Sequence, residues 1–86
     1  MQQFIYTIKD RDGVHARPAG VIIQAAHKFK SDIALKAKGK QISLKGGIFS
    51  LMGLGIRCGD EIEVVCTGED ETEAAAAMRQ SFEQNL

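Results

Sequence analysis

The sequence contains little cysteine, no surplus of charge and no long apolar run, and each absence excludes a class of protein. Cys58 and Cys66 are too few for a disulfide framework, and with two histidines they do not match the spacing of a zinc site. The eleven basic and eleven acidic residues cancel. This balance argues against nucleic acid as a partner, because binding to a phosphate backbone needs a basic surplus. No run approaches the roughly 18 apolar residues of a membrane span, so we expect no membrane insertion.

The 86 residues suffice for one domain, which we expect to span residues 1–86. The start of the chain, MQQFIYTIKDRD, lacks the basic beginning, apolar middle and cleavage site of a secretory signal. We therefore expect a cytoplasmic protein whose two thiols are reduced.

Segments in which apolar residues recur at every second position alternate along the chain with segments in which they recur at helical spacing. Alternation of apolar and polar residues over 3–9, 33–37, 42–44 and 62–66 predicts four strands, and helical spacing predicts helices from Ala16 to Phe29 and over 74–82. Asp70 and Glu73 have the spacing of a capping box at the start of the last helix. With a short apolar segment over 48–54, the order is βαββαβα. Strands with one wet face predict an α+β fold: a two-layer open-faced sandwich, in which helices cover one face of a four-stranded antiparallel sheet.

The chemistry is concentrated in residues 13–18, GVHARP, where a loop meets a helix. The first N–H groups of a helix have no internal partner, so the backbone amides of Ala16 and Arg17 are expected to bind a phosphate. The Arg17 guanidinium can clamp phosphate oxygens, and the neutral imidazole of His15 is a nucleophile. Either side chain alone is more often an ordinary surface residue. Their combination predicts a phosphohistidine site.

The segment over 48–54, IFSLMGL, has apolar residues on two sides of a short helix. Ile48, Phe49 and Met52 fall within one arc of about 100°, whereas Leu51 and Leu54 lie on the other side. One interpretation is that all five belong to the core. The other is that the two leucines face inward and the remaining three form an exposed docking patch.

Residues 13–19, GVHARPA, resemble the active-site motif of HPr, the histidine-containing phosphocarrier of the bacterial phosphoenolpyruvate:sugar phosphotransferase system. The element order agrees with that family over nearly the whole chain. The resemblance implies that His15 carries a phosphoryl group on Nδ1, assisted by Arg17. Enzyme I would be the donor and a sugar-specific enzyme IIA the acceptor. The protein would then be a stoichiometric carrier rather than an enzyme, and we expect a monomer without a cofactor or metal.

The same resemblance implies where the partners dock. The surface would combine the short helix with the edge of the first helix: Gly20, Gln24, His27, Ile48, Phe49 and Met52.

One position departs from the family pattern. Many HPr proteins of Gram-positive bacteria carry a regulatory serine directly after a lysine, at the start of the short helix. Here Lys45 is followed by Gly46 and Gly47, and neither Ser43 nor Ser50 matches that position. We therefore expect no regulatory serine.

Two further interpretations remain open. One is an HPr-like regulatory or nitrogen-branch paralogue, although regulatory paralogues keep the serine and lose the histidine. The other is a small acyl-phosphate hydrolase, which would need a second polar group, such as an asparagine, to position water. The only asparagine is Asn85.

Overall fold

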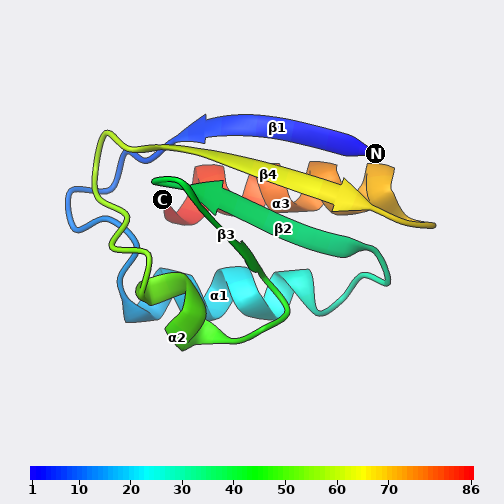
Figure 1. Cartoon of the computed structure of the whole chain (residues 1–86), viewed down its shortest axis with the longest axis horizontal. Coiled ribbons are helices and arrows are strands. Elements are labelled where there is room, and N and C mark those ends of the chain that lie inside the picture. The colour runs from blue at the N-terminus through cyan, green and yellow to red at the C-terminus, as the bar shows by residue number, and fades with distance from the viewer.

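Four strands form one antiparallel sheet in the computed structural model, which describes residues 1–86 (Figure 1). They are β1 (Gln2–Thr7), β2 (Asp32–Ala37), β3 (Lys40–Ser43) and β4 (Glu61–Thr67), in the spatial order β1-β4-β2-β3. β4 pairs with both β1 and β2, and its Val64 lies opposite Phe4 on one side and Leu35 on the other. β2 and β3 form a hairpin closed by Lys38 and Gly39, which both have positive φ, as a two-residue turn requires.

Three helices cover one face of this sheet: α1 (Ala16–Ala26), α2 (Ile48–Met52) and α3 (Glu71–Asn85) (Figure 1). α3 packs against β1 and β4, and α1 packs against both α3 and α2. The opposite face of the sheet is open, and Ile5 is exposed there. None of the helices has the length and apolar composition of a membrane span. The predicted βαββαβα order and open-faced sandwich are confirmed.

The core lies between the sheet and the helices. Alternate side chains of the strands and the inward faces of α1 and α3 are buried in one cluster, which includes Phe4, Tyr6, Ile33, Leu35, Ile62, Val64, Cys66, Ala19, Ile22, Ala26, Met78 and Phe82. The ring of Phe82 stacks on Tyr6 and meets Phe4 edge to face, with centroids 5.9 and 6.1 Å away. These contacts hold the end of α3 against β1. Cys58 is exposed, Cys66 is buried, and both thiols are free.

The predicted capping box at Asp70 and Glu73 is wrong. Asp70 is the N-cap residue of α3, but its side chain makes no capping bond. Its carboxylate instead accepts hydrogen bonds from the backbone amides of Lys30 and Ser31, both at 2.9 Å, and from the Ser31 hydroxyl. Asp70 therefore connects the start of α3 to the segment between α1 and β2. The reason is tertiary: the carboxylate binds donors 39 and 40 residues away instead of the helix amides.

The contacts of Asp70 predict a specific acid sensitivity. Hydrogen bonds to its carboxylate, the strongest from the Ser31 hydroxyl and the next from the Lys30 amide, lower the pKa of Asp70 to about 2. Because the unfolded pKa is higher, about 3.9, the ionised carboxylate stabilises the folded protein at pH values above about 4. That stabilisation is lost as the pH falls towards about 2.

Asp70→Asn, which mimics the protonated acid, is therefore expected to lower the free energy of unfolding near neutral pH but to match the wild type near pH 2. Denaturant unfolding across this range measures the difference. The control is Glu69→Gln, which removes a charge from an exposed neighbour. If Asp70→Asn lowered the free energy of unfolding equally at every pH, the ionised Asp70 carboxylate would not be the source of the stabilisation.

Candidate functional site

His15 occupies the junction between a loop and α1. It is the N-cap residue of the helix, with extended backbone angles, and its side chain makes no capping bond. Its carbonyl accepts the first helical hydrogen bond from the Ala19 amide, at 3.0 Å. Pro18 follows as the third helical residue, where the missing N–H costs no hydrogen bond. The imidazole is 41% exposed, so a reacting group can reach it.

The amides of Ala16 and Arg17 donate no hydrogen bond within the chain. No acidic residue lies in the first turn of α1, and the Arg17 side chain is exposed without an ion-pair partner. Unpaired amides at the positive end of a helix dipole, with an unpaired arginine in the same turn, form a suitable environment for a dianionic group. His15, the two amides and Arg17 thus lie at the same end of α1, and their roles as nucleophile, donors and cation stay predictions.

The loop before His15 is anchored by backbone hydrogen bonds to distant segments. The Val14 amide donates to the Ile56 carbonyl at 3.1 Å, and the amides of Lys9 and Asp10 donate to a terminal oxygen of Leu86 at 2.6 and 2.7 Å. Val14, Ile56 and Leu86 are all buried. The position of His15 is thus set by the end of α3 and by the loop before β4.

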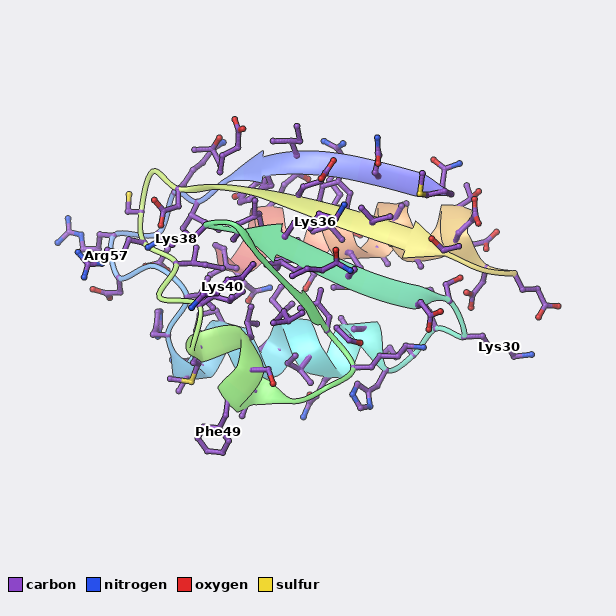
Figure 2. The ribbon with its side chains drawn as sticks, in the orientation of Figure 1. Lys30, Lys36, Lys38, Lys40, Phe49 and Arg57 are labelled. Carbon is purple, nitrogen blue, oxygen red and sulfur yellow. The ribbon has the colours of Figure 1, made fainter.

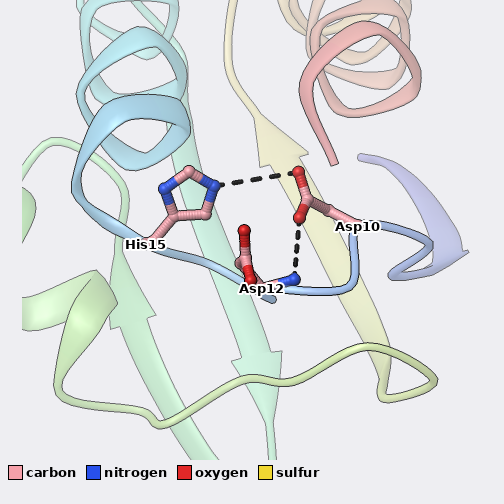
Figure 3. A group of neighbouring side chains, drawn as sticks. All are labelled: Asp10, Asp12 and His15. Atoms are coloured by element: carbon pink, nitrogen blue, oxygen red, sulfur yellow. Dashed lines mark hydrogen bonds and ion pairs between the residues drawn. The ribbon is translucent and has the colours of Figure 1, made fainter.

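Two carboxylates lie beside the imidazole (Figure 3). Asp10 Oδ2 is 3.7 Å from His15 Nε2, and Asp10 Oδ1 accepts a hydrogen bond from the Asp12 amide at 2.8 Å. The motif at residues 13–18 does not include either aspartate, and their approach to the ring was not predicted. An available signal was their spacing, five and three residues before His15 in a turn that reverses the chain.

One oxygen or nitrogen atom from each of Asp10, Asp12 and His15 lies within 4.8 Å of the other two. One Asp10 oxygen is already bound to a backbone amide, and Asp12 is exposed. We therefore assign no metal to this group, and the absence of a metal stays a prediction.

The expected docking patch on α2 is only partly free. Phe49 is 85% exposed and points away from the body of the protein (Figure 2). Ile48 and Met52 are half-buried and pack against the core, which corrects the expectation that all three stand free. Leu51 and Leu54 are buried, as predicted. A helix of five residues places Ile48 and Met52 at the boundary between core and solvent, because one turn cannot separate two apolar arcs completely.

The edge of α1 continues this surface. A Cβ atom added at Gly20 would make an ordinary van der Waals contact with Ile48 Cδ1, at 3.9 Å, so Gly20 lies beside Ile48 where the two helices pack. Gln24 and His27 are exposed on α1. The six residues Gly20, Gln24, His27, Ile48, Phe49 and Met52 are called the α1–α2 surface below.

The segment before α2 carries no hydroxyl at the helix entrance. Gly47 is the N-cap residue, with φ of +124°, a conformation that other residues rarely adopt. Ser43 lies at the end of β3, where its Oγ accepts from the Lys45 amide, and Ser50 lies inside α2.

Comparison with known proteins gives consistent results. The family model described as "PTS HPr component phosphorylation site" matches residues 2–84. Phosphocarrier protein HPr of Mycoplasma genitalium is 44% identical over 86 residues, covering 99% of this chain and 97% of that protein.

Two solved structures are also similar. The histidine-containing phosphocarrier protein of a mycoplasma superposes with a TM-score of 0.92, at 37% identity and over 96% of this chain and 93% of that one. An HPr dimer from Thermoanaerobacter tengcongensis superposes with a TM-score of 0.76, at 34% identity and over 98% and 95% of the two chains.

Gly13 provides a test of the loop anchor. A Cβ atom there would lie 2.4 Å from the Ile56 oxygen and 2.9 Å from Arg57 Cα, and φ is +65°. Gly55 has nearly the same φ, +66°, with no atom within 4 Å of an added Cβ. We expect Gly55→Ala to cost roughly 1–2 kcal/mol from backbone strain alone. Gly13→Ala is expected to cost clearly more, because it also displaces the carbonyl that binds Val14. Denaturant unfolding measures the stability of both variants. Equal losses of stability would show that the loop held by the Val14–Ile56 hydrogen bond is not rigid.

Proposed function

This chain belongs to the HPr family of phosphocarrier proteins of the phosphotransferase system, and we propose that it relays a phosphoryl group from phospho-enzyme I to a sugar-specific enzyme IIA through a phosphohistidine at His15. The observation that carries this proposal is the exposed His15 ring at a helix end with two unpaired amides. We place the relay in the cytoplasm. The protein is proposed to act as a monomer, although an HPr dimer is known from a relative.

The proposed transfer uses groups that are already in place. His15 Nδ1 attacks phosphorus, the bond from phosphorus to the donor atom of phospho-enzyme I breaks, and that donor atom keeps the electron pair. The amides of Ala16 and Arg17 then bind phosphoryl oxygens, and the Arg17 guanidinium balances their charge. The reverse step passes the group to the acceptor. No cofactor takes part in this scheme, and the protein is regenerated only by its partners.

The α1–α2 surface is the proposed docking site for both partners. Phe49 supplies a large exposed aromatic group, the type of side chain that anchors protein interfaces. The half-buried Ile48 and Met52 extend its apolar area, while Gln24 and His27 provide a polar rim. α1 begins beside His15 and packs against α2, so a partner docked here would approach the imidazole.

The alternatives lack the groups that they need. A serine-regulated paralogue would require a hydroxyl at the start of α2, where Gly46 and Gly47 stand. An acyl-phosphate hydrolase would require an asparagine to orient water, but the Asn85 amide donates to the Ser81 carbonyl at 2.8 Å. A carrier of a nitrogen branch would use the same histidine and the same docking surface. The sugar relay is the proposal because the motif at residues 13–19 resembles that of the sugar phosphotransferase system.

His15→Ala is expected to abolish phosphorylation by enzyme I and phosphoenolpyruvate, because it removes the nucleophile. The fold should survive, since a partly exposed residue at a helix end contributes little to the core. Intact mass detects the added group, and circular dichroism checks the fold. The modification should be labile in acid and stable in alkali, as a phosphoramidate is. Phosphorylation of a folded His15→Ala protein would refute the assignment.

The α1–α2 surface predicts opposite effects for two neighbouring side chains. Phe49→Glu should weaken binding to enzyme I with little change in thermal stability, because Phe49 is 85% exposed. Leu51→Ala should cost about 2–5 kcal/mol of stability, because Leu51 is fully buried. Titration calorimetry and thermal unfolding separate the two effects. If Phe49→Glu unfolds the protein, Phe49 is a core residue and the docking proposal fails.

A further inference from the structure

The Asp10 carboxylate is held in one orientation. Its Oδ1 accepts a hydrogen bond from the Asp12 amide at 2.8 Å, and the Asp10 carbonyl accepts one from the Gly13 amide at 2.9 Å. The Asp10 amide is bound to Leu86 at 2.7 Å. Because Oδ1 is fixed in this way, the other carboxylate oxygen, Oδ2, is free to face the ring and lies 3.7 Å from His15 Nε2 (Figure 3).

This geometry distinguishes the two nitrogens of the imidazole. A neutral imidazole carries one proton, on either nitrogen, and an ionised carboxylate can only accept a hydrogen bond. The separation of 3.7 Å is longer than a hydrogen bond, but the negative charge of Oδ2 stabilises a proton on the nearer nitrogen, Nε2, which leaves a lone pair on Nδ1. Figure 3 shows Nδ1 on the side of the ring away from Asp10. A carboxylate at the distal nitrogen orients the catalytic imidazole of serine hydrolases by the same principle.

We infer that Asp10 is a positioning residue that holds the proton of His15 on Nε2 and thereby keeps Nδ1 free to accept a phosphoryl group; this inference rests on the proposed function. When Nδ1 bonds to phosphorus, the Nε2 proton stays on the ring, which becomes a cation. The Asp10 carboxylate balances that charge. On transfer to the acceptor, the bonding electron pair returns to Nδ1 and the ring is again neutral, with its proton still on Nε2.

Asp12 provides a matched control. Its carboxylate belongs to the same group, within 4.8 Å, but it makes no ion pair with the ring. Asp12→Asn therefore removes the same charge from the same loop without removing the contact at 3.7 Å. It also keeps the backbone amide that fixes Asp10.

Asp10→Asn inverts the contact while keeping the turn. The asparagine carbonyl can still accept from the Asp12 amide, so the side-chain NH₂ takes the place of Oδ2 and faces Nε2. This N–H donor favours a lone pair on Nε2 and moves the ring proton to Nδ1. A purely structural role for Asp10 would leave the tautomer unchanged in this variant.

The experiment records long-range ¹H–¹⁵N correlations of ¹⁵N-labelled protein at about pH 8.5, where an imidazole is neutral. We expect a proton on Nε2 in the wild type and in Asp12→Asn, and a clear gain of the Nδ1-protonated form in Asp10→Asn. Phosphoryl transfer from enzyme I is measured in parallel. Its kcat is expected to fall about three- to tenfold in Asp10→Asn, with KM unchanged because the α1–α2 surface is intact, and to stay within about twofold in Asp12→Asn.

Two results would overturn the inference: the same tautomer in Asp10→Asn as in the wild type, or equal effects of the two substitutions, which would indicate a general electrostatic effect. A wild-type protein that enzyme I does not phosphorylate would instead refute the proposed function. The tautomer measurement needs no phosphoryl donor, so it still decides the Asp10 contact in that case.

Discussion

The site depends on leaving the first turn of α1 without a cap. A Ser, Thr, Asp or Asn at the N-cap position typically stabilises a helix by about 1 kcal/mol, because its side chain binds one of the unpaired amides. This chain has His15 at that position, and the ring does not bind back to the helix. The amides of Ala16 and Arg17 consequently stay available for an anion. The helix end thus lacks the local stability of a cap, at the place where the proposed phosphoryl transfer needs free donors.

Other parts of the fold compensate for this uncapped helix end. The loop before His15 is bound to the end of α3 through Leu86 and to the loop before β4 through Ile56. At the opposite end of α1, Asp70 holds the segment that leads into β2. α1 also presses its apolar face against α3, and α3 in turn is fixed to β1 by its aromatic contacts. His15 is therefore exposed on a rigid framework, which suits the proposed relay between two partners.

The sequence by itself determined the fold class, and it also indicates the residues of the proposed site. Hydrophobic periods of two and 3.6 residues identify strands and helices because each element must bury one face, and these periods are local properties. The proposed site at residues 13–18 also follows from the sequence alone, since its histidine, amides and guanidinium are adjacent in the chain. The inward positions of Leu51 and Leu54 follow from the same helical period.

Only the tertiary structure decided the remaining features, because each depends on residues that are distant in the chain or on the direction of a side chain. Asp70 has the spacing of a capping residue, yet the Ser31 and Lys30 donors lie where its carboxylate can reach them. Ile48 and Met52 share an arc with Phe49, but packing of α2 against the core covers part of both. Asp10 lies only five residues before His15, and its approach to Nε2 arises because Leu86 and Asp12 fix its backbone and one carboxylate oxygen. Sequence spacing alone does not decide such contacts, since the folded chain brings their partners together.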